Sequence, residues 1–252
     1  APLSRAPLDY PEIGAAHRAS CLESGEEAAA WRRDPGKEEP EKDGSPPAGG
    51  SLCQLAPLGE LPADSIEEVI RRRGSTRRFA RTPIALAQLS TILQTATGGI
   101  PADYLEPLGA SLNGLYVIAH SVEGLPAGAY FYRGESHALE QLKKGNFRRE
   151  AGYLDLEQDL AADASANIYC LADLRPVLGR FGNRGYRAAQ LEGGILGGRI
   201  YLAAYAQRLG ATGLTFYDDD VTRFFSPHAE GKSVMFLTAV GRRAKRAVLY
   251  QR

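Results

Sequence analysis

The fold is decided by residues 184–210, which read RGYRAAQLEGGILGGRIYLAAYAQRLG. Small and apolar residues fill most of these positions, charges are few, and no proline interrupts the run. This pattern predicts one long helix that is apolar on most faces and ends at Gly210. A helix of this kind belongs in the middle of a core or in a subunit interface.

The segments around this helix read as strands. LYVIAH (115–120), ANIYCLA (166–172) and SVMFLTAVG (233–241) have the composition of buried strands, and GAYFYRGESHALEQL (128–142) has that of a hairpin turning near Gly134. Helices and strands occur in groups rather than in regular alternation. The order predicts an α+β fold, with a mainly antiparallel sheet flanked by helices, instead of a βαβ succession.

Local signals predict where several shorter helices begin. In DSIEEVIRRR (64–73), Ser65 and Glu68 have the spacing of a capping box. Thr82 and Pro83 are expected to open a second helix, as N-cap and first helical residue. Residues 146–163 predict one or two short helices, and Asp218 is expected to cap the helix DDDVTRFF.

The first sixty residues differ from the rest. Residues 32–50 are rich in proline, glycine and charge, so they cannot bury enough apolar surface to offset their ordering entropy. The preceding segment, 17–31, is expected to form a short helix that docks through Leu22 and Trp31. We therefore predict a lead-in and linker over 1–63, and a compact domain over 64–252 with a strand-like piece, AVLY, in its C-terminal tail.

Composition excludes several classes of function. The chain has 30 basic and 30 acidic residues, which argues against a nucleic-acid binder or a polybasic membrane-surface protein. No apolar run is long enough to span a bilayer, and the start lacks a secretory signal, so a cytoplasmic protein is expected. The three cysteines and four histidines are scattered, which predicts neither a disulfide framework nor a metal site. No P-loop or dinucleotide-binding glycine pattern is present.

The sharpest chemical feature is RRRGSTRRF, residues 71–79, in which five arginines fall within eight residues. Cations after a helix C-terminus are mildly favourable on structural grounds alone. That explanation accounts less well for Ser75 and Arg77, which lie beyond the helix. A loop that presents guanidinium groups, a hydroxyl and free backbone N–H groups suits a phosphate monoester.

Two further segments are candidates for the same site. VGRR (240–243) ends a predicted core strand in two arginines, which are either surface residues or the completion of a phosphate site. GATGLTF (210–216) is either a helix stop followed by a strand or a backbone that lies against a flat ligand.

Together these stretches resemble the nitroreductase family. Residues 73–79 are similar to the Arg-x-Ser-x-Arg/Lys-x-Phe pattern that opens such domains. The hairpin at 124–142, the region 180–220 and the strand VMFLTAVGR resemble the SagB-type branch, the peptide azoline dehydrogenases. The resemblance covers about residues 64–243, and the lead-in resembles one that sometimes joins two tandem copies.

The resemblance implies a dimer with FMN at the subunit interface. Arg73, Gly74, Ser75 and Arg77 would then hold the phosphate and ribityl chain, and Arg242 would complete the phosphate site. The backbone of residues 213–215 (Gly213, Leu214 and Thr215) would face the flavin ring, with the Thr215 N–H near N5.

The sequence also departs from the family pattern. In PLGASLN (107–113), Leu108 replaces the usual serine, and Ser111 or Asn113 is expected to supply the lost polar contact with the flavin. The Lys-Tyr pair of azoline dehydrogenases is replaced by Arg180 and Phe181. Phenylalanine cannot exchange a proton and arginine hardly ever loses one.

Tyr186 and Arg180 are therefore the catalytic candidates that remain, with Tyr186 either a proton donor or a packed structural residue. The predicted function is FMN-dependent hydride transfer by a ping-pong mechanism. The substrate is a small molecule or a modified peptide, and NAD(P)H is a candidate electron donor. The alternative is a degenerate, non-catalytic partner subunit, or one half of a tandem assembly.

Overall fold

A computed structural model describes residues 8–33, 49–105 and 111–244. Its central feature is a sheet of seven strands in the order β1-β6-β5-β3-β7-β9-β8, and all its neighbouring pairs are antiparallel. The strands are β1 Leu52–Gln54, β3 Gly114–Ala119, β5 Gly128–Arg133, β6 Ala138–Lys144, β7 Ala166–Asp173, β8 Gly210–Gly213 and β9 Lys232–Gly241. The predicted antiparallel-rich α+β fold is confirmed. Over the described residues, no helix combines the length and apolar character that crossing a bilayer requires.

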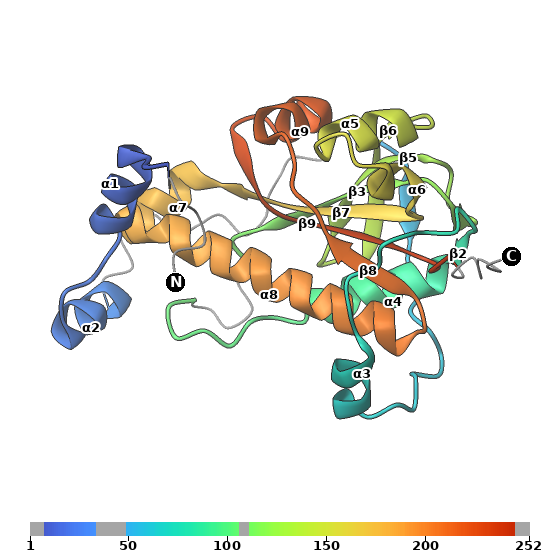
Figure 1. The fold of residues 1–252 in the computed structure, drawn as a ribbon, viewed down its shortest axis with the longest axis horizontal. Coiled ribbons are helices and arrows are strands. Elements are labelled where there is room, and N and C mark those ends of the chain that lie inside the picture. Colours follow the sequence, from blue (N-terminus) through green and yellow to red (C-terminus); the bar gives the residue numbers. More distant parts are fainter. Residues whose placement is uncertain (1–7, 34–48, 106–110, 245–252) are drawn as a thin grey trace, which may run out of the picture.

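Alternation along the strands gives the sheet two apolar faces. In β3, Leu115 and Val117 pack into the cluster that contains α4 (Leu86–Ala96) and α8 (Gly185–Ala206), whereas Tyr116 and Ile118 pack into the opposite cluster. On that opposite face lie α5 (Arg148–Leu154), α6 (Asp159–Asp163) and α9 (Asp218–Phe225), as Figure 1 shows. Helices therefore cover both faces.

The long helix predicted over 184–210 is α8, which crosses beneath the sheet (Figure 1). It is preceded by α7 (Leu174–Phe181) and a short 3-10 turn at Gly182–Arg184. A Cβ atom on Gly197 would lie 2.3 Å from Cε1 of Phe236, so this glycine allows α8 to approach β9 closely. Gly194 and Gly198 instead face open space on the outer side of the helix.

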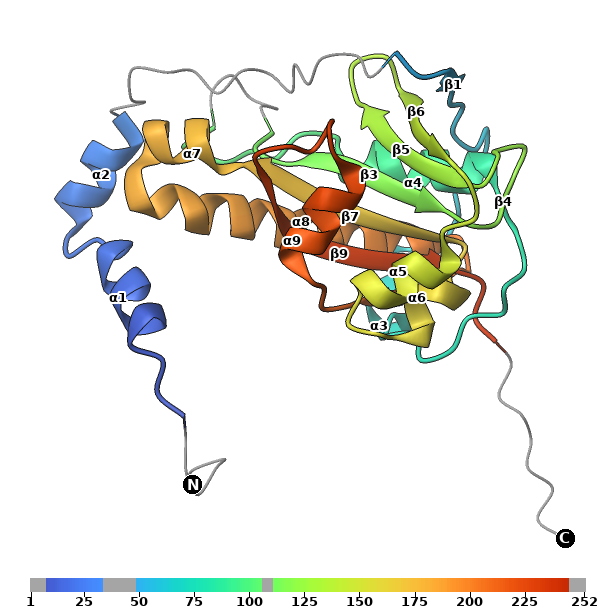
Figure 2. The ribbon, with the colours of Figure 1, turned by 90° about the horizontal axis from the view of Figure 1, so that it is seen from above.

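The lead-in forms two helices, α1 (Pro11–Ala19) and α2 (Gly25–Arg33), which lie beside α7 and the start of α8 (Figure 2). The indole Nε1 of Trp31 donates to the carbonyl of Phe181 at 2.9 Å. The expected docking of this segment through Trp31 is therefore confirmed, but the single helix expected over 17–31 is wrong, because residues 20–24 separate α1 from α2. Strand β1 lies before the predicted domain start at residue 64, yet it pairs with β6 at the sheet edge, so the sheet includes part of the expected lead-in.

Two helix starts differ from the prediction. The capping box of Ser65 and Glu68 is present in α3 (Ile66–Arg72), but Thr82 and Pro83 do not open α4. Residues 84–85 instead form β2 (Ile84–Ala85), which pairs with β4 (Val122–Glu123), and α4 begins at Leu86. Asp218 is the first residue of α9, and its carboxylate accepts from the N–H of Val234 rather than capping the helix. Most of the predicted linker and the AVLY tail lie outside the described residues.

Candidate functional site

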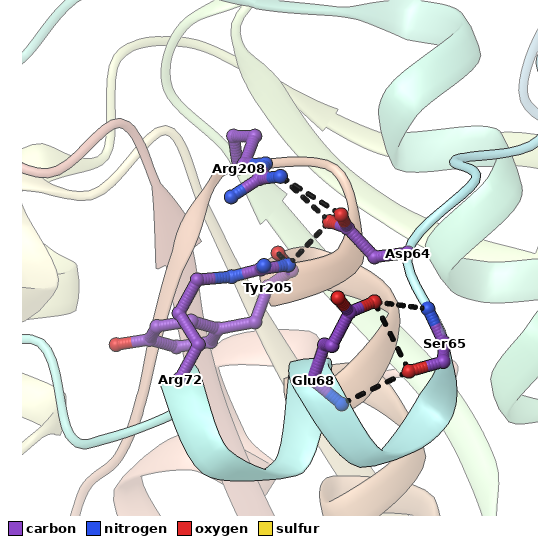
Figure 3. Close-up of polar contacts among 6 residues, drawn as sticks. All are labelled: Asp64, Ser65, Glu68, Arg72, Tyr205 and Arg208. Atoms are coloured by element: carbon purple, nitrogen blue, oxygen red, sulfur yellow. Dashed lines mark hydrogen bonds and ion pairs between the residues drawn. The ribbon is translucent and has the colours of Figure 1, made fainter.

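The arginine-rich loop begins where α3 ends. The Ser65 N–H donates to Oε2 of Glu68 at 2.8 Å, and the Glu68 N–H donates to Oγ of Ser65 at 3.3 Å (Figure 3). These two bonds satisfy the first turn of α3. The helix then ends at Arg72, and Arg73 already has an extended backbone. Local sequence thus determines where the loop starts.

Asp64 ties α3 to the end of α8. Its carboxylate accepts from Arg72 at 2.8 Å and from Arg208 at 2.9 Å, and Arg72 also donates to the carbonyl of Tyr205 at 3.0 Å (Figure 3). The side chains of Asp64 and Arg72 are 22% and 23% exposed. Their ion pair is therefore shielded from water more than an ion pair at the surface would be. We define these residues, Asp64, Arg72, Tyr205 and Arg208, as the α3–α8 clamp.

Replacing Asp64 with Asn is expected to lower the free energy of unfolding by roughly 1–2 kcal/mol, because two guanidinium groups lose their charged partner. Chemical denaturation measures this change. Glu67→Gln is the matched control, since Glu67 pairs with Arg71 at the surface and that pair contributes little. Equal effects of the two substitutions would contradict the clamp.

Beyond the clamp, the loop packs against β8. The Thr76 N–H donates to the carbonyl of Ala211 at 2.9 Å, and the hydroxyls of Thr76 and Tyr205 lie 3.2 Å apart. A Cβ atom on Gly210 would lie 2.3 Å from Oγ1 of Thr76, so only glycine allows this approach. The structure therefore brings together the arginine loop and the glycine-containing strand, two segments more than 130 residues apart.

Three predicted phosphate ligands of this loop face solvent. The side chains of Arg73, Ser75 and Arg77 are exposed and have no hydrogen-bond or ion-pair partner within 8–33, 49–105 and 111–244. By contrast, the neighbouring Arg71 and Arg72 are both ion-paired. A Cβ atom on Gly74 would meet nothing within 4 Å, so the space above this residue is open. The loop thus presents two uncommitted guanidinium groups and a hydroxyl.

One of the three predicted ring contacts near the end of β8 has a free backbone donor. The Gly213 N–H donates to the hydroxyl of Tyr201, and the Leu214 N–H donates to the carbonyl of Leu237 at 3.4 Å. The Thr215 N–H has no acceptor among the described residues, and Thr215 is exposed. Of the three predicted ring contacts, only Thr215 therefore has an amide free to donate to a ligand.

Arg243, rather than Arg242, is the neighbour of the loop. The Nε atom of Arg242 donates to the carbonyl of Pro83 at 3.0 Å, away from β8. The Cζ atom of Arg243 lies 5.5 Å from the ring centroid of Tyr205, and its Cγ atom borders Gly210. Sequence reasoning missed Arg243 because either arginine could be the one that turns toward the loop. The pairing of Phe79 with Arg243, which settles this, is a tertiary contact.

Ser111 and Asn113 lie beside α8. The Asn113 side chain donates to the carbonyl of Ala189 at 3.0 Å and to the carboxylate of Glu192 at 2.6 Å. Burial raises the pKa of Glu192, although hydrogen bonds from Asn113 and from the Leu112 N–H oppose the shift. Oδ1 of Asn113 is buried with no partner among the described residues. Neither Ser111 nor Asn113 forms a hydrogen bond with the arginine loop.

The two catalytic candidates occupy the other end of α8. Arg180 lies in the last turn of α7 and is 8% exposed, whereas Tyr186 lies in the first turn of α8 and is 48% exposed. In the single chain, Tyr186 is therefore not part of the core. Arg180 precedes α8 and Tyr186 lies at the start of α8, whereas the α3–α8 clamp lies at the end of α8. A single chain therefore does not bring Arg180 and Tyr186 to the arginine loop (Figure 1).

The profile of the nitroreductase family matches residues 70–242, which include the loop, α8 and the end of β9. The chain belongs to the nitroreductase family. Among the relatives of this family member is a Methanocaldococcus jannaschii protein named as a nitroreductase. It is 27% identical over 169 residues, which cover 65% of this chain and 85% of the relative.

Solved nitroreductase-fold structures show the same architecture. A protein of Anabaena variabilis described as a nitroreductase is 27% identical with a TM-score of 0.68, over 83% of this chain and 43% of its own. This nitroreductase-family chain thus spans less than half of that longer protein. A chain of the E. coli microcin synthetase complex has a TM-score of 0.59 at 17% identity, over 94% of this chain and 95% of its own. At that identity the likeness concerns the fold alone.

Proposed function

We propose that this nitroreductase-family chain is an FMN-dependent oxidoreductase. The observation that carries the proposal is the 2.9 Å hydrogen bond from the Thr76 N–H to the Ala211 carbonyl, which joins the arginine loop to β8. Because of this contact, the free side chains of Arg73, Ser75 and Arg77 begin a surface that continues along β8 to Thr215. Anion-binding groups at one end and a free backbone amide at the other match the two ends of FMN.

The residues present fit FMN. Two guanidinium groups and a hydroxyl without partners among the described residues supply the donors that a phosphate monoester requires. Thr215 lies four positions after Ala211, which corresponds to at most roughly 13 Å at about 3.3 Å per residue. That distance is of the order needed to pass from a phosphate to a flavin ring.

Each part of the site has a separate task. Arg73, Ser75 and Arg77 would hold the phosphate, and the Thr215 N–H would donate to the ring near N5. When bound, FMN supplies the hydride chemistry, and the protein supplies binding, orientation and exclusion of water. We propose a ping-pong sequence in which a donor such as NAD(P)H and a small-molecule or modified-peptide substrate use the same pocket in turn.

We propose that a second copy completes the site. Helix α8 has 22 residues and is roughly 33 Å long, so Tyr186 and the clamp lie far apart in one chain. The outer side of α8 carries Gly194 and Gly198, which face open space, with Leu191 exposed at its start. Two such helices packed antiparallel in a homodimer would bring the start of α8 in one copy beside the clamp of the other.

An alternative is that the chain is a non-catalytic subunit or half of a tandem assembly. Phe181, in place of a tyrosine, is buried and 5.5 Å from the ring of Trp31, so it acts as a packing residue. The length of the Anabaena protein is consistent with a tandem arrangement. A purified protein that cannot be reconstituted with FMN would favour this alternative, and bound flavin that donors bleach would favour the oxidoreductase.

Replacing Arg77 with Ala is expected to weaken FMN binding by about 1.5–3 kcal/mol, because one charge-assisted hydrogen bond to the phosphate is lost. Flavin fluorescence titration measures the dissociation constant. Arg78→Ala is the matched control, since Arg78 is an exposed neighbour that is expected to face away from the phosphate. Unchanged affinity in Arg77→Ala would remove this residue from the site.

A further inference from the structure

A groove of about 340 Å³ lies where the lead-in meets the start of α8. Trp31 and Tyr104 form one side, with their ring centroids 5.5 Å apart, and Leu191 and Ala188 line the α8 side. This volume suits a small organic ligand. Within one chain the groove is separate from the arginine loop, which lies at the other end of α8.

The groove carries positive charge that is not neutralised. Arg184 and Arg187 both line it, and neither has a carboxylate partner among the described residues. Arg184 donates to the carbonyl of Ser20 at 3.1 Å, and Arg187 donates to Oγ of Ser20 at 2.7 Å, so these partners are neutral. Asp103, the acid of the groove, is already paired with Arg32.

Two further polar groups of this region lack partners among the described residues. The hydroxyl of Tyr104, which lines the groove, is buried without a hydrogen bond. Burial, together with Glu192 and Asp103, raises the pKa of Tyr104, so the hydroxyl keeps its proton and remains a donor. The second group is Arg180, which is 8% exposed and whose Nε atom has no hydrogen-bond partner. Its Cζ atom lies 4.7 Å from the ring centroid of Phe181. Phe181 in turn packs against Trp31 and Tyr104.

We propose that this groove binds a carboxylate ligand with an apolar or aromatic body. A carboxylate accepts hydrogen bonds only, through two oxygens, and the Arg184 and Arg187 guanidinium groups are donors on the same groove. The apolar part of the ligand would lie against Trp31 and Leu191. The proposal does not depend on flavin binding, because none of these residues belongs to the arginine loop or to β8.

Trp31 is the only tryptophan of the chain, so its fluorescence reports on the groove directly. The probe is 3-phenylpropionate, and 3-phenylpropionamide is the neutral comparison with the same body. We expect a saturable change of Trp31 fluorescence with the carboxylate, which added salt weakens, and roughly tenfold weaker binding of the amide. Equal affinity of the two probes, or no saturable change, would overturn the proposal.

Substitutions assign the effect to the groove. Arg184→Gln is expected to weaken carboxylate binding roughly tenfold, with little effect on the amide. Arg149→Gln is the control for net charge, since Arg149 is exposed on α5, across the sheet from α8. An Arg184→Gln variant that keeps wild-type affinity, or an equal loss in Arg149→Gln, would overturn the assignment. The comparison of the two probes on the unaltered protein tests the proposal even if a variant fails to fold.

Discussion

The Asp155→Asn variant should be more stable than the unaltered protein at neutral pH, because it lacks the loss of stability that ionisation of Asp155 causes. Asp155 is fully buried at the end of α5, where Oδ1 accepts from the hydroxyl of Tyr169 at 2.9 Å. Its other oxygen has no partner among the described residues. Burial raises the pKa of Asp155 from 3.8 to about 8, although the Tyr169 hydrogen bond acts in the opposite direction.

The sign follows from proton binding. Between the two pKa values, the folded protein keeps the Asp155 proton while the unfolded chain has released it, so rising pH favours the unfolded chain. The stability from this group is full below the unfolded pKa and is lost as pH rises toward 8. At about 1.4 kcal/mol per pH unit, Asp155 should destabilise the unaltered protein by roughly 2–3 kcal/mol relative to Asp155→Asn between about pH 5 and about pH 7. Burial lowers the pKa of His120 from 6.5 to about 3, which acts in the opposite direction in both proteins, so the difference between the two proteins is the quantity to compare.

Urea denaturation at these two pH values measures the change. In Asp155→Asn this loss should be absent, because the amide does not ionise. Asp219→Asn is the matched control, since Asp219 is exposed in α9, and it should retain the pH dependence of the unaltered protein. An equal pH dependence in the unaltered protein and in Asp155→Asn would show that another group causes it.

Gly210→Ala should lower the free energy of unfolding by roughly 2–4 kcal/mol and weaken FMN binding as well. The new Cβ atom would lie 2.3 Å from Oγ1 of Thr76 and 2.6 Å from Cγ of Arg243. Overpacking of this kind costs about 1–3 kcal/mol. Displacing Thr76 also breaks its hydroxyl contact with Tyr205, which leaves two polar groups without a partner at a further cost of about 1–3 kcal/mol.

The matched control is Gly213→Ala, at the other end of β8. There the nearest atom would lie 3.6 Å from the new Cβ, an ordinary contact, so stability should change by less than about 1 kcal/mol. Thermal unfolding and flavin titration of both variants give the comparison. If the two variants lose the same stability, the loop does not depend on close contact at Gly210.

Local patterns were sufficient for most of the secondary structure. The capping box at Ser65 was predicted because its two hydrogen bonds join residues three apart. The start of α4 was predicted wrongly, because residues 84–85 pair with β4. This contact joins segments almost 40 residues apart. In that place tertiary pairing outweighed the helix signal of Thr82 and Pro83.

The candidate site divides in the same way. The sequence by itself determined the long apolar helix, the alternating strands and the cluster of arginines around Ser75, because these follow from residue type and short spacing. Only the tertiary structure decided that Thr76 bonds to Ala211, that Arg243 turns toward the loop, and that Tyr186 lies a full helix length away. Such contacts depend on how distant segments pack, and packing is a property of the whole fold rather than of any one stretch of chain.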